Sequence, residues 1–162
     1  MFRVFISSSI NDMYIVNELT NILNKYGIET SVPWNLPTNI EYTRAIYQQI
    51  YNSDCILVII SLSTGYYENV NYEIKTAKSL SKTIIPLIEY GAYIPNNLRD
   101  KDYILIDRMQ PRLSYENAAK YLHSLKIQKE RKNGIGGLIL LGLGLLLLAA
   151  LSSEENNDVA PR

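Results

Sequence analysis

The chain is poor in the residues that form disulfides and common metal sites: its 162 residues include one Cys, one His and one Trp. A single Cys excludes an intramolecular disulfide and a multi-cysteine zinc site, so Cys55 is expected to be a buried apolar residue. A single His excludes a histidine cluster on a metal and leaves His123 as the only candidate for Ser-His-Asp chemistry. We therefore expect neither a metal site nor a prosthetic group.

The chain also lacks a surplus of either charge, with 16 Lys and Arg against 16 Asp and Glu. A nucleic-acid-binding surface normally shows a basic surplus, so the composition argues against nucleic acid as a partner. This neutrality is an average over unlike parts, because 126–133 is basic, 134–153 carries no charge and 154–162 is acidic. We predict a folded domain over 1–125, a basic juxtamembrane segment, a transmembrane helix and a short polar tail.

The uncharged segment contains a run, 135–151, that reads IGGLILLGLGLLLLAAL without one polar side chain. As a helix this run would span about 26 Å, close to the ~30 Å hydrocarbon core of a bilayer. A domain of this size cannot enclose a helix that is apolar on every side, so a membrane span is favoured over a buried core helix. The cations precede the run, and the positive-inside rule then places 1–133 in the cytoplasm. We expect a single-pass C-terminal anchor in a lipid bilayer, with a cytoplasmic domain.

Short apolar runs alternate with helical patterns along the first 125 residues. Strands are predicted over 3–7, 28–32, 55–61, 83–88 and 103–107, and helices over 12–26, 41–51, 63–80 and 115–129. Asp12 is predicted to be the N-cap of the first of these helices. The alternation indicates an α/β fold with a doubly wound, flavodoxin-like sheet of five parallel strands. No glycine-rich phosphate loop follows the first strand, which argues against a dinucleotide-binding dehydrogenase or a P-loop enzyme.

Ligands of doubly wound sheets bind outside the carboxyl ends of the strands, and several polar and aromatic residues are predicted there. These candidate binding residues are Ser7, Ser8, Ser9, Trp34, Ser61, Ser63, Tyr66 and Tyr67. Serines at strand ends are most often caps, so it is their shared location that makes them candidates. Trp34 lies in a proline-flanked loop, where it either covers the edge of the core or stacks on a ligand or a neighbouring domain.

Four stretches of the sequence carry a resemblance to a known family. They are VFIS at 4–7 with Asp12 in the following loop, the loop 34–39, the run IYQQIYNSDCILVII at 46–60, and NVNYEIKTA at 69–77 followed by TIIPLI at 83–88. In this order they resemble the first box, the BB loop, the I-x-x-x-I-x-x-S-D helix exit and the V-x-x-E-I/L-x-x-A pattern of the TIR (Toll/interleukin-1 receptor) domain family, in its bacterial and archaeal form. The resemblance covers roughly 1–125.

Many TIR domains of this form cleave NAD+ between nicotinamide and ribose, and the resemblance implies NAD+ as substrate and Glu73 as the catalytic residue. A carboxylate facing the ribose suits this reaction, because it stabilises the positive charge that develops on the sugar. Nicotinamide leaves as a neutral base, so no strong general acid is needed. The family often has Trp four residues before this Glu, where this chain has Asn69, on the same helix face, so Asn69 is a further candidate binding residue. Trp34, Tyr66 or Tyr67 would then supply the aromatic wall.

The resemblance implies a membrane-anchored NAD+ hydrolase or cyclase in prokaryotic immune defence signalling. It further implies self-association through TIR–TIR contacts, in which the BB loop of one domain completes the pocket of the next, and contacts with other TIR or defence proteins. Two alternatives stay open: a non-enzymatic membrane-anchored TIR adaptor, favoured by Asn69, and an enzyme like the nucleoside deoxyribosyltransferases, which also use a Glu on ribose. Without the resemblance, Glu73 would be interpreted as a solvated helix carboxylate.

Overall fold

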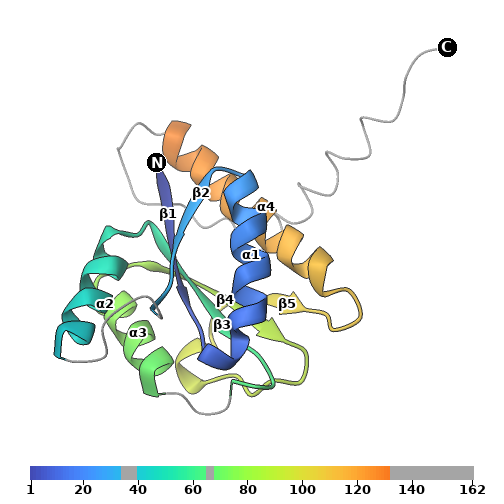
Figure 1. Ribbon diagram of the computed structural model, residues 1–162, viewed down its shortest axis with the longest axis horizontal. Coiled ribbons are helices and arrows are strands. Elements are labelled where there is room, and N and C mark those ends of the chain that lie inside the picture. The colour runs from blue at the N-terminus through green and yellow to red at the C-terminus, as the bar shows by residue number, and fades with distance from the viewer. Residues whose placement is uncertain (34–39, 65–67, 132–162) are drawn as a thin grey trace.

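The computed structural model describes residues 1–33, 40–64 and 68–131. They form a parallel sheet of five strands with helices on both faces (Figure 1). The strands are β1 Phe2–Ser7, β2 Ile28–Ser31, β3 Cys55–Ile60, β4 Thr83–Glu89 and β5 Ile104–Ile106. The helices are α1 Met13–Lys25, α2 Ile40–Asn52, α3 Glu68–Ser79 and α4 Pro111–Arg131, with short 3-10 turns η1 Ile10–Asp12 and η3 Asn96–Leu98.

The strands lie in the order β2-β1-β3-β4-β5, which confirms the predicted flavodoxin-like α/β topology. The order reverses between β1 and β3, which pair in parallel from Val4 opposite Cys55 to Ser7 opposite Val58. The chain therefore leaves β1 toward one side of the sheet and leaves β3 toward the other. Ligands of such folds bind at the carboxyl ends of the two strands that flank this switch point.

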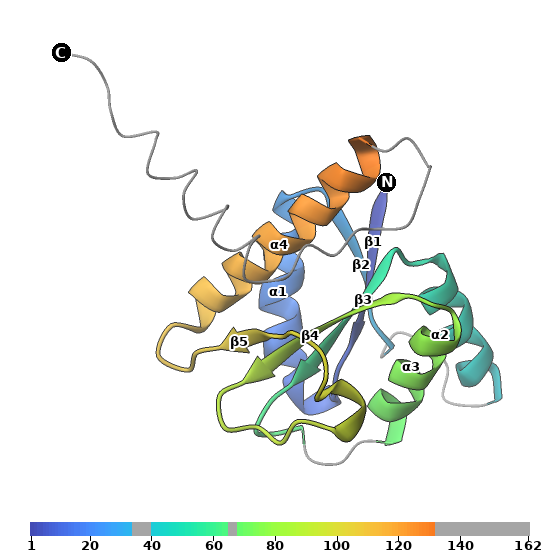
Figure 2. The same cartoon turned by 180° about the vertical axis from the view of Figure 1, so that it is seen from behind.

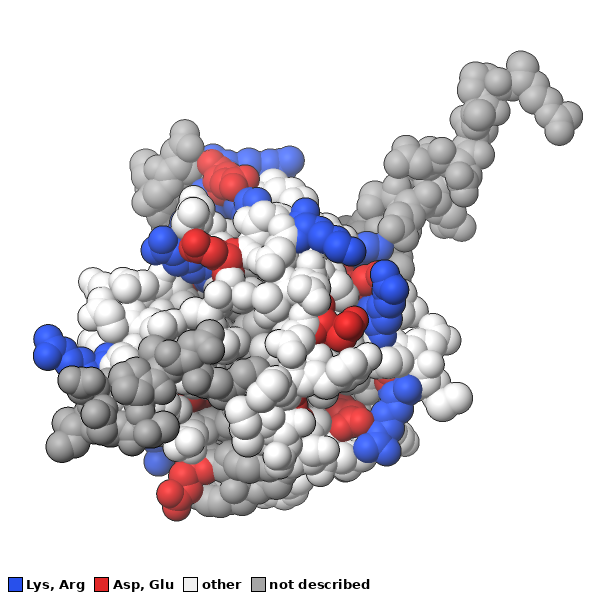
Figure 3. Space-filling model, viewed as in Figure 1, with Lys and Arg blue, Asp and Glu red and all other residues white. Residues whose placement is uncertain are grey.

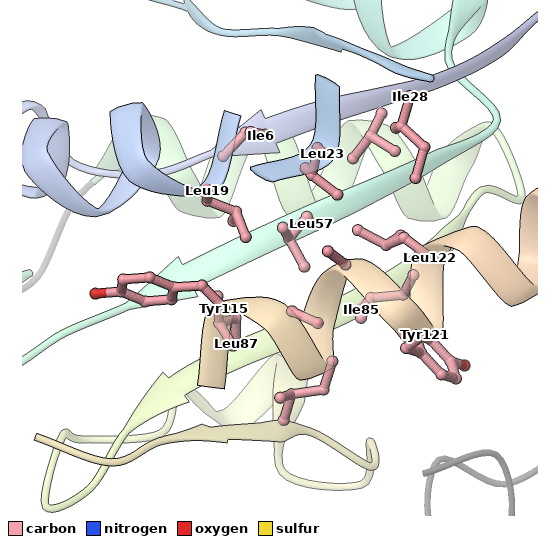
Figure 4. Packing of buried hydrophobic residues seen from close by; sticks show 14 of the residues in the cluster. Ile6, Leu19, Leu23, Ile28, Leu57, Ile85, Leu87, Tyr115, Tyr121 and Leu122 are labelled. Atoms are coloured by element: carbon pink, nitrogen blue, oxygen red, sulfur yellow. The ribbon is translucent and has the colours of Figure 1, made fainter. Parts of the chain in front are cut away.

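Helices α1 and α4 cover one face of the sheet, and α2 and α3 cover the other (Figures 1 and 2). This two-sided cover explains the sequence CILVII of β3, in which all six residues are buried. Cys55 belongs to that buried run, as predicted. Figure 4 shows the core under α1 and α4, where Leu19 and Leu122 from the helices pack toward Leu57 of the sheet.

Several elements end at other residues than predicted. Strands β2 and β5 are shorter, because each lies at an edge of the sheet and is defined by a single neighbour. Helix α4 begins at Pro111, a residue favoured in the first turn of a helix, and continues to Arg131. The first cations of the predicted juxtamembrane segment thus belong to a helix of the domain: Lys126 donates to the Tyr26 carbonyl at 2.9 Å, and Lys129 pairs with Asp54 at 2.7 Å.

Within the ranges 1–33, 40–64 and 68–131, no helix is long and apolar enough to cross a membrane. The predicted transmembrane helix 134–153 and the polar tail 154–162 lie outside the described residues. The charges of the domain are mixed: on the face shown in Figure 3, Lys and Arg side chains lie interspersed with Asp and Glu.

Candidate active site

Glu73 is a buried carboxylate on the face of α3 that packs against the sheet. Its exposed fraction is 1%, although a Glu within a helix normally lies in solvent. Val70, Ile74 and Ala77 anchor this face of α3 in the second core, which α2 and α3 form with the sheet. The position of Glu73 between these residues therefore forces its side chain toward the carboxyl edge of β1.

Two hydroxyl groups from distant parts of the chain bond to this carboxylate. Ser7 Oγ donates to Oε2 of Glu73 at 2.5 Å, and the Tyr42 hydroxyl donates to Oε1 at 3.4 Å. Ser7 ends β1 and points to the same side of the sheet as Phe5, two residues earlier. Tyr42 lies in the first turn of α2. The end of one strand and two helices thus converge on Glu73.

The carboxyl group of Glu73 has no cationic partner among the described residues, and burial raises its pKa from 4.5 to about 7. The hydrogen bonds from Ser7 and Tyr42 act in the opposite direction, because they stabilise the carboxylate form. Burial, with the neighbouring charge of Glu73, also raises the pKa of Tyr42 to about 12. Glu73 is therefore poised between its neutral and charged forms near neutral pH, and a positive charge placed beside it would favour the carboxylate.

A second buried carboxylate, Asp12, connects the loops on the two sides of the switch point. Its Oδ1 accepts from Ser61 Oγ at 2.5 Å and its Oδ2 from Thr64 Oγ1 at 2.9 Å. The two hydroxyls are themselves held, because Ser61 Oγ accepts from the Ser63 amide and Thr64 Oγ1 from the Ser61 amide. Asp12 does stand at the N-cap of α1, as predicted, but its side chain makes no capping bond there. Both of its oxygens instead accept hydrogen bonds from the β3–α3 loop.

The candidate binding serines have different environments. Ser7 contacts Glu73, whereas Ser61 and the Ser63 amide belong to the Asp12 network. The Ser9 hydroxyl accepts from the Asn11 amide and caps the turn η1, which is a structural role. The Ser8 hydroxyl is buried and has no hydrogen-bond partner among the described residues. A buried hydroxyl without a partner is unfavourable, so Ser8 has no stabilising role that its hydrogen bonding explains.

The residues predicted to form an aromatic wall, Trp34, Tyr66 and Tyr67, lie outside the described residues. Asn69 lies in the first turn of α3, one turn before Glu73, and is exposed. Two residues were missed at the sequence level, namely Tyr42 as a partner of Glu73 and Asp12 as the centre of a network. A signal for Tyr42 existed: it precedes the buried Ile46 by four residues, so it had to lie on the inner face of α2.

The family of the chain follows from comparison with known sequences. A family model described as TIR domain matches residues 4–122. The chain belongs to the TIR domain family. The match runs from within β1 into α4, and it includes Ser7, Asp12 and Glu73. No curated protein sequence matches the chain.

Solved structures of low sequence identity share the fold. The TIR domain of a Toll-related receptor from Hydra magnipapillata superposes with a TM-score of 0.61 at 22% identity, covering 75% of this chain and 98% of the other. The CMP N-glycosidase BcmB from Clostridium botulinum superposes with a TM-score of 0.56 at 18% identity, covering 72% and 96%. A diflavin flavoprotein from Nostoc sp. reaches 0.52 at 14% identity, covering 82% and 96%. At these identities the similarity establishes the α/β fold.

Proposed function

We propose that this TIR domain cleaves the bond between nicotinamide and ribose in NAD+, with Glu73 as the catalytic carboxylate. The observation that carries the proposal is the burial of Glu73 at the carboxyl edge of the sheet without a cation beside it, which raises its pKa to about 7. A buried carboxyl group without a partner of opposite charge destabilises the folded protein when that group is ionised. Such groups are found where a protein uses their altered ionisation, as at catalytic sites.

The charge of the substrate suits this environment. The nicotinamide ring of NAD+ is positively charged, so its entry beside Glu73 would favour the carboxylate form. As the bond from nicotinamide to ribose breaks, its electron pair leaves with nicotinamide and the positive charge moves to the sugar. The carboxylate then stabilises this charge at short range and in a site shielded from water. Water adds to the sugar carbon and loses one proton, which gives ADP-ribose and neutral nicotinamide; addition of a ring nitrogen of the adenine base instead would give a cyclic product.

Ser7 and Tyr42 would orient the reacting carboxylate. Each donates to a different oxygen of Glu73, so the plane of the carboxyl group is fixed from two sides. A carboxylate oxygen can accept more than one hydrogen bond, and the remaining lone pairs are available for the hydroxyls of a ribose.

The family assignment supports the proposal, because the TIR family includes NAD+ hydrolases as well as adaptors. The fold is also found in a protein named as a CMP N-glycosidase, whose reaction breaks the same class of bond. We further propose that residues 134–153 anchor the domain in a lipid bilayer with the domain in the cytoplasm, and that the protein acts in prokaryotic immune defence. Confinement to a membrane raises the effective concentration of neighbouring domains and would favour their self-association.

The test is product analysis with the full chain reconstituted in liposomes and incubated with NAD+. Glu73→Gln should lower nicotinamide release by about 100-fold or more, because it removes the charge and keeps the shape. The matched control is Glu68→Gln, which makes the same change on the exposed first turn of α3 and should leave the rate unchanged. Undiminished release by Glu73→Gln would refute the catalytic role of Glu73.

The adaptor alternative is favoured by Asn69, which is exposed where the family often has Trp. Liposomes that carry the wild-type chain at high density distinguish the two functions. Self-association without any release of nicotinamide would support an adaptor. Base exchange on deoxynucleosides, assayed in the same samples, would instead support an enzyme like the nucleoside deoxyribosyltransferases.

A further inference from the structure

The last turns of α4 lie at the edge of the sheet where the strands begin, which we call the amino edge. Lys126 donates to the Gly27 carbonyl at 3.1 Å, just before β2. Lys129 pairs with Asp54 at 2.7 Å, just before β3. In Figures 1 and 2 the arrow of β1 points away from this end of α4. The 21 residues of α4 form a helix about 31 Å long, so α4 runs from the carboxyl end of β5 to the amino edge.

The proposed membrane span begins close to the amino edge. Helix α4 ends at Arg131, and the uncharged segment begins at 134. Three peptide units join the two positions, and they cover at most about 11 Å when fully extended. A domain anchored through 134–153 must therefore keep the end of α4 within this distance of the start of the span. The amino edge is then the part of the domain nearest to the lipid headgroups.

The amino edge carries positive charge that is not neutralised within the domain. Lys25 ends α1, two residues before Gly27, and Arg131 ends α4. Both are exposed, and neither makes an ion pair or a hydrogen bond with a described residue. Lys126 bonds to carbonyl groups only, so its charge is not neutralised either. The exposed Glu130 offsets one of these three charges, and the surplus makes this edge attractive to an anionic surface.

The carboxyl edge, where β1, β3 and β4 end, has the opposite character. Asp12 follows β1, Glu68 and Glu73 follow β3, and Glu89 ends β4. The ranges 8–13, 61–64, 68–73 and 89–96 at this edge contain no Lys or Arg. Arg108, from the loop after β5, pairs with Glu89 alone. An anionic membrane would therefore attract the amino edge and repel the carboxyl edge.

We propose that the amino edge lies on the headgroups of an anionic bilayer, with Lys25 and Arg131 against the lipid anions, and that the carboxyl edge with Glu73 faces away from the membrane. This inference rests on the proposed anchor at 134–153 and does not depend on the chemistry at Glu73. A cation at an anionic bilayer surface should raise the ratio of domains lying on the headgroups to domains tilted away from them about fivefold.

The orientation is tested by energy transfer from a dye on the protein to acceptor dyes on lipid headgroups. The full chain is reconstituted in liposomes of phosphatidylcholine and phosphatidylserine. The native Cys55 is buried and stays unlabelled in the folded protein, so one exposed Cys is introduced at a time. Asn24→Cys places the dye at the end of α1, and Tyr90→Cys places it just after β4. Strand β4 is about 23 Å long, so the two dyes should lie at clearly different distances from the bilayer.

Transfer should be stronger from Asn24→Cys than from Tyr90→Cys. Extraction with alkaline carbonate, run on the same liposomes, separates this inference from the proposed anchor. Equal transfer from the two positions, or stronger transfer from Tyr90→Cys, in a chain that resists extraction would overturn the orientation and leave the anchor standing. A chain that carbonate removes from the liposomes would refute the anchor and the orientation together.

Charge variants distinguish contact with lipid from the effect of the tether alone. Lys25→Gln combined with Arg131→Gln should lower the ratio of domains on the headgroups about 25-fold, and so remove most of the difference in transfer between the two dyes. Liposomes of phosphatidylcholine alone should have the same effect on the wild type. The matched control is Lys75→Gln combined with Arg112→Gln, which removes two exposed cations from α3 and from the first turn of α4 and should keep the difference. A difference that survives both the variant and the neutral liposomes would refute the contact with lipid anions.

Discussion

The hydroxyl of Ser61 donates a hydrogen bond to the carboxylate of Asp12 at 2.5 Å, and this bond joins the loop after β1 to the loop after β3. Both residues are almost fully buried, and Thr64 binds the second oxygen of Asp12. Because β1 and β3 flank the switch point, the bond holds together the two loops that follow these strands. Ser7 precedes one of these loops and α3 follows the other, so the Asp12 network lies between the elements that carry Glu73 and its partner Ser7.

Asp12→Ala should lower the free energy of unfolding by about 3 kcal/mol, because it removes two buried hydrogen bonds to a carboxylate and leaves the Ser61 hydroxyl without its acceptor. Urea denaturation of the full chain in detergent, followed by circular dichroism, measures the change. Glu116→Ala is the control: it breaks an exposed pair with Arg112 and should cost less than about 0.5 kcal/mol. Equal effects of the two substitutions would contradict the role assigned to Asp12.

The rate of NAD+ cleavage should depend on the ionisation of Glu73. We expect kcat/KM to rise with pH and to level off above about 7, since only the carboxylate stabilises a positive sugar. Ser7→Ala removes a hydrogen bond that lowers the pKa of Glu73, so it should move the midpoint upward by about one unit. Ser9→Ala is the control and should leave the midpoint unchanged, because the Ser9 hydroxyl bonds to the Asn11 amide and not to Glu73. A slower Ser7→Ala enzyme with an unmoved midpoint would show that Ser7 does not act on this pKa.

Much of the fold could be predicted from local patterns. The six apolar residues of β3 required cover on both faces, and the alternation of strand and helix required a parallel sheet. The ends of the edge strands could not be predicted, because they depend on where the neighbouring strand stops. Val32 continues the apolar pattern of β2, yet the pairing with β1 ends at Ser31 opposite Phe5.

The candidate site was only partly predictable for a related reason. The pattern around Glu73 identified the residue, but the burial that raises its pKa is a property of the folded chain. Its hydrogen-bond partners, Ser7 and Tyr42, are 66 and 31 residues away in the chain. The same holds for Asp12, whose partner Ser61 is 49 residues away. A helical period places such residues on an inner face, but it does not state which side chains meet there.

Glu73 should also make the stability of the protein depend on pH. Its pKa in the folded protein is about 7, above the value of 4.5 in the unfolded chain, so the folded state holds a proton that the unfolded state has lost in this range. The free energy of unfolding of the wild type should therefore fall relative to that of Glu73→Gln as pH rises from 4.5 to 7, by about 3 kcal/mol in total. Urea denaturation of both proteins from pH 4 to 8 measures this difference, because the contributions of the other titrating groups to the free energy of unfolding cancel between the two proteins. A constant difference would contradict the raised pKa.

Lys126 should stabilise the folded domain, although the sequence places it in the predicted basic juxtamembrane segment, 126–133. Its ammonium donates to the carbonyls of Tyr26 at 2.9 Å and Gly27 at 3.1 Å, just past the end of α1, where backbone carbonyls lack helical partners. Lys126→Met keeps the length of the side chain and removes both bonds, so it should cost about 1 to 2 kcal/mol of unfolding free energy. Lys101→Met, at an exposed lysine, should have little effect. The measurement is urea denaturation of the full chain, with flotation on anionic vesicles run in parallel. Weaker flotation of Lys126→Met at unchanged stability would show instead that this lysine serves the membrane.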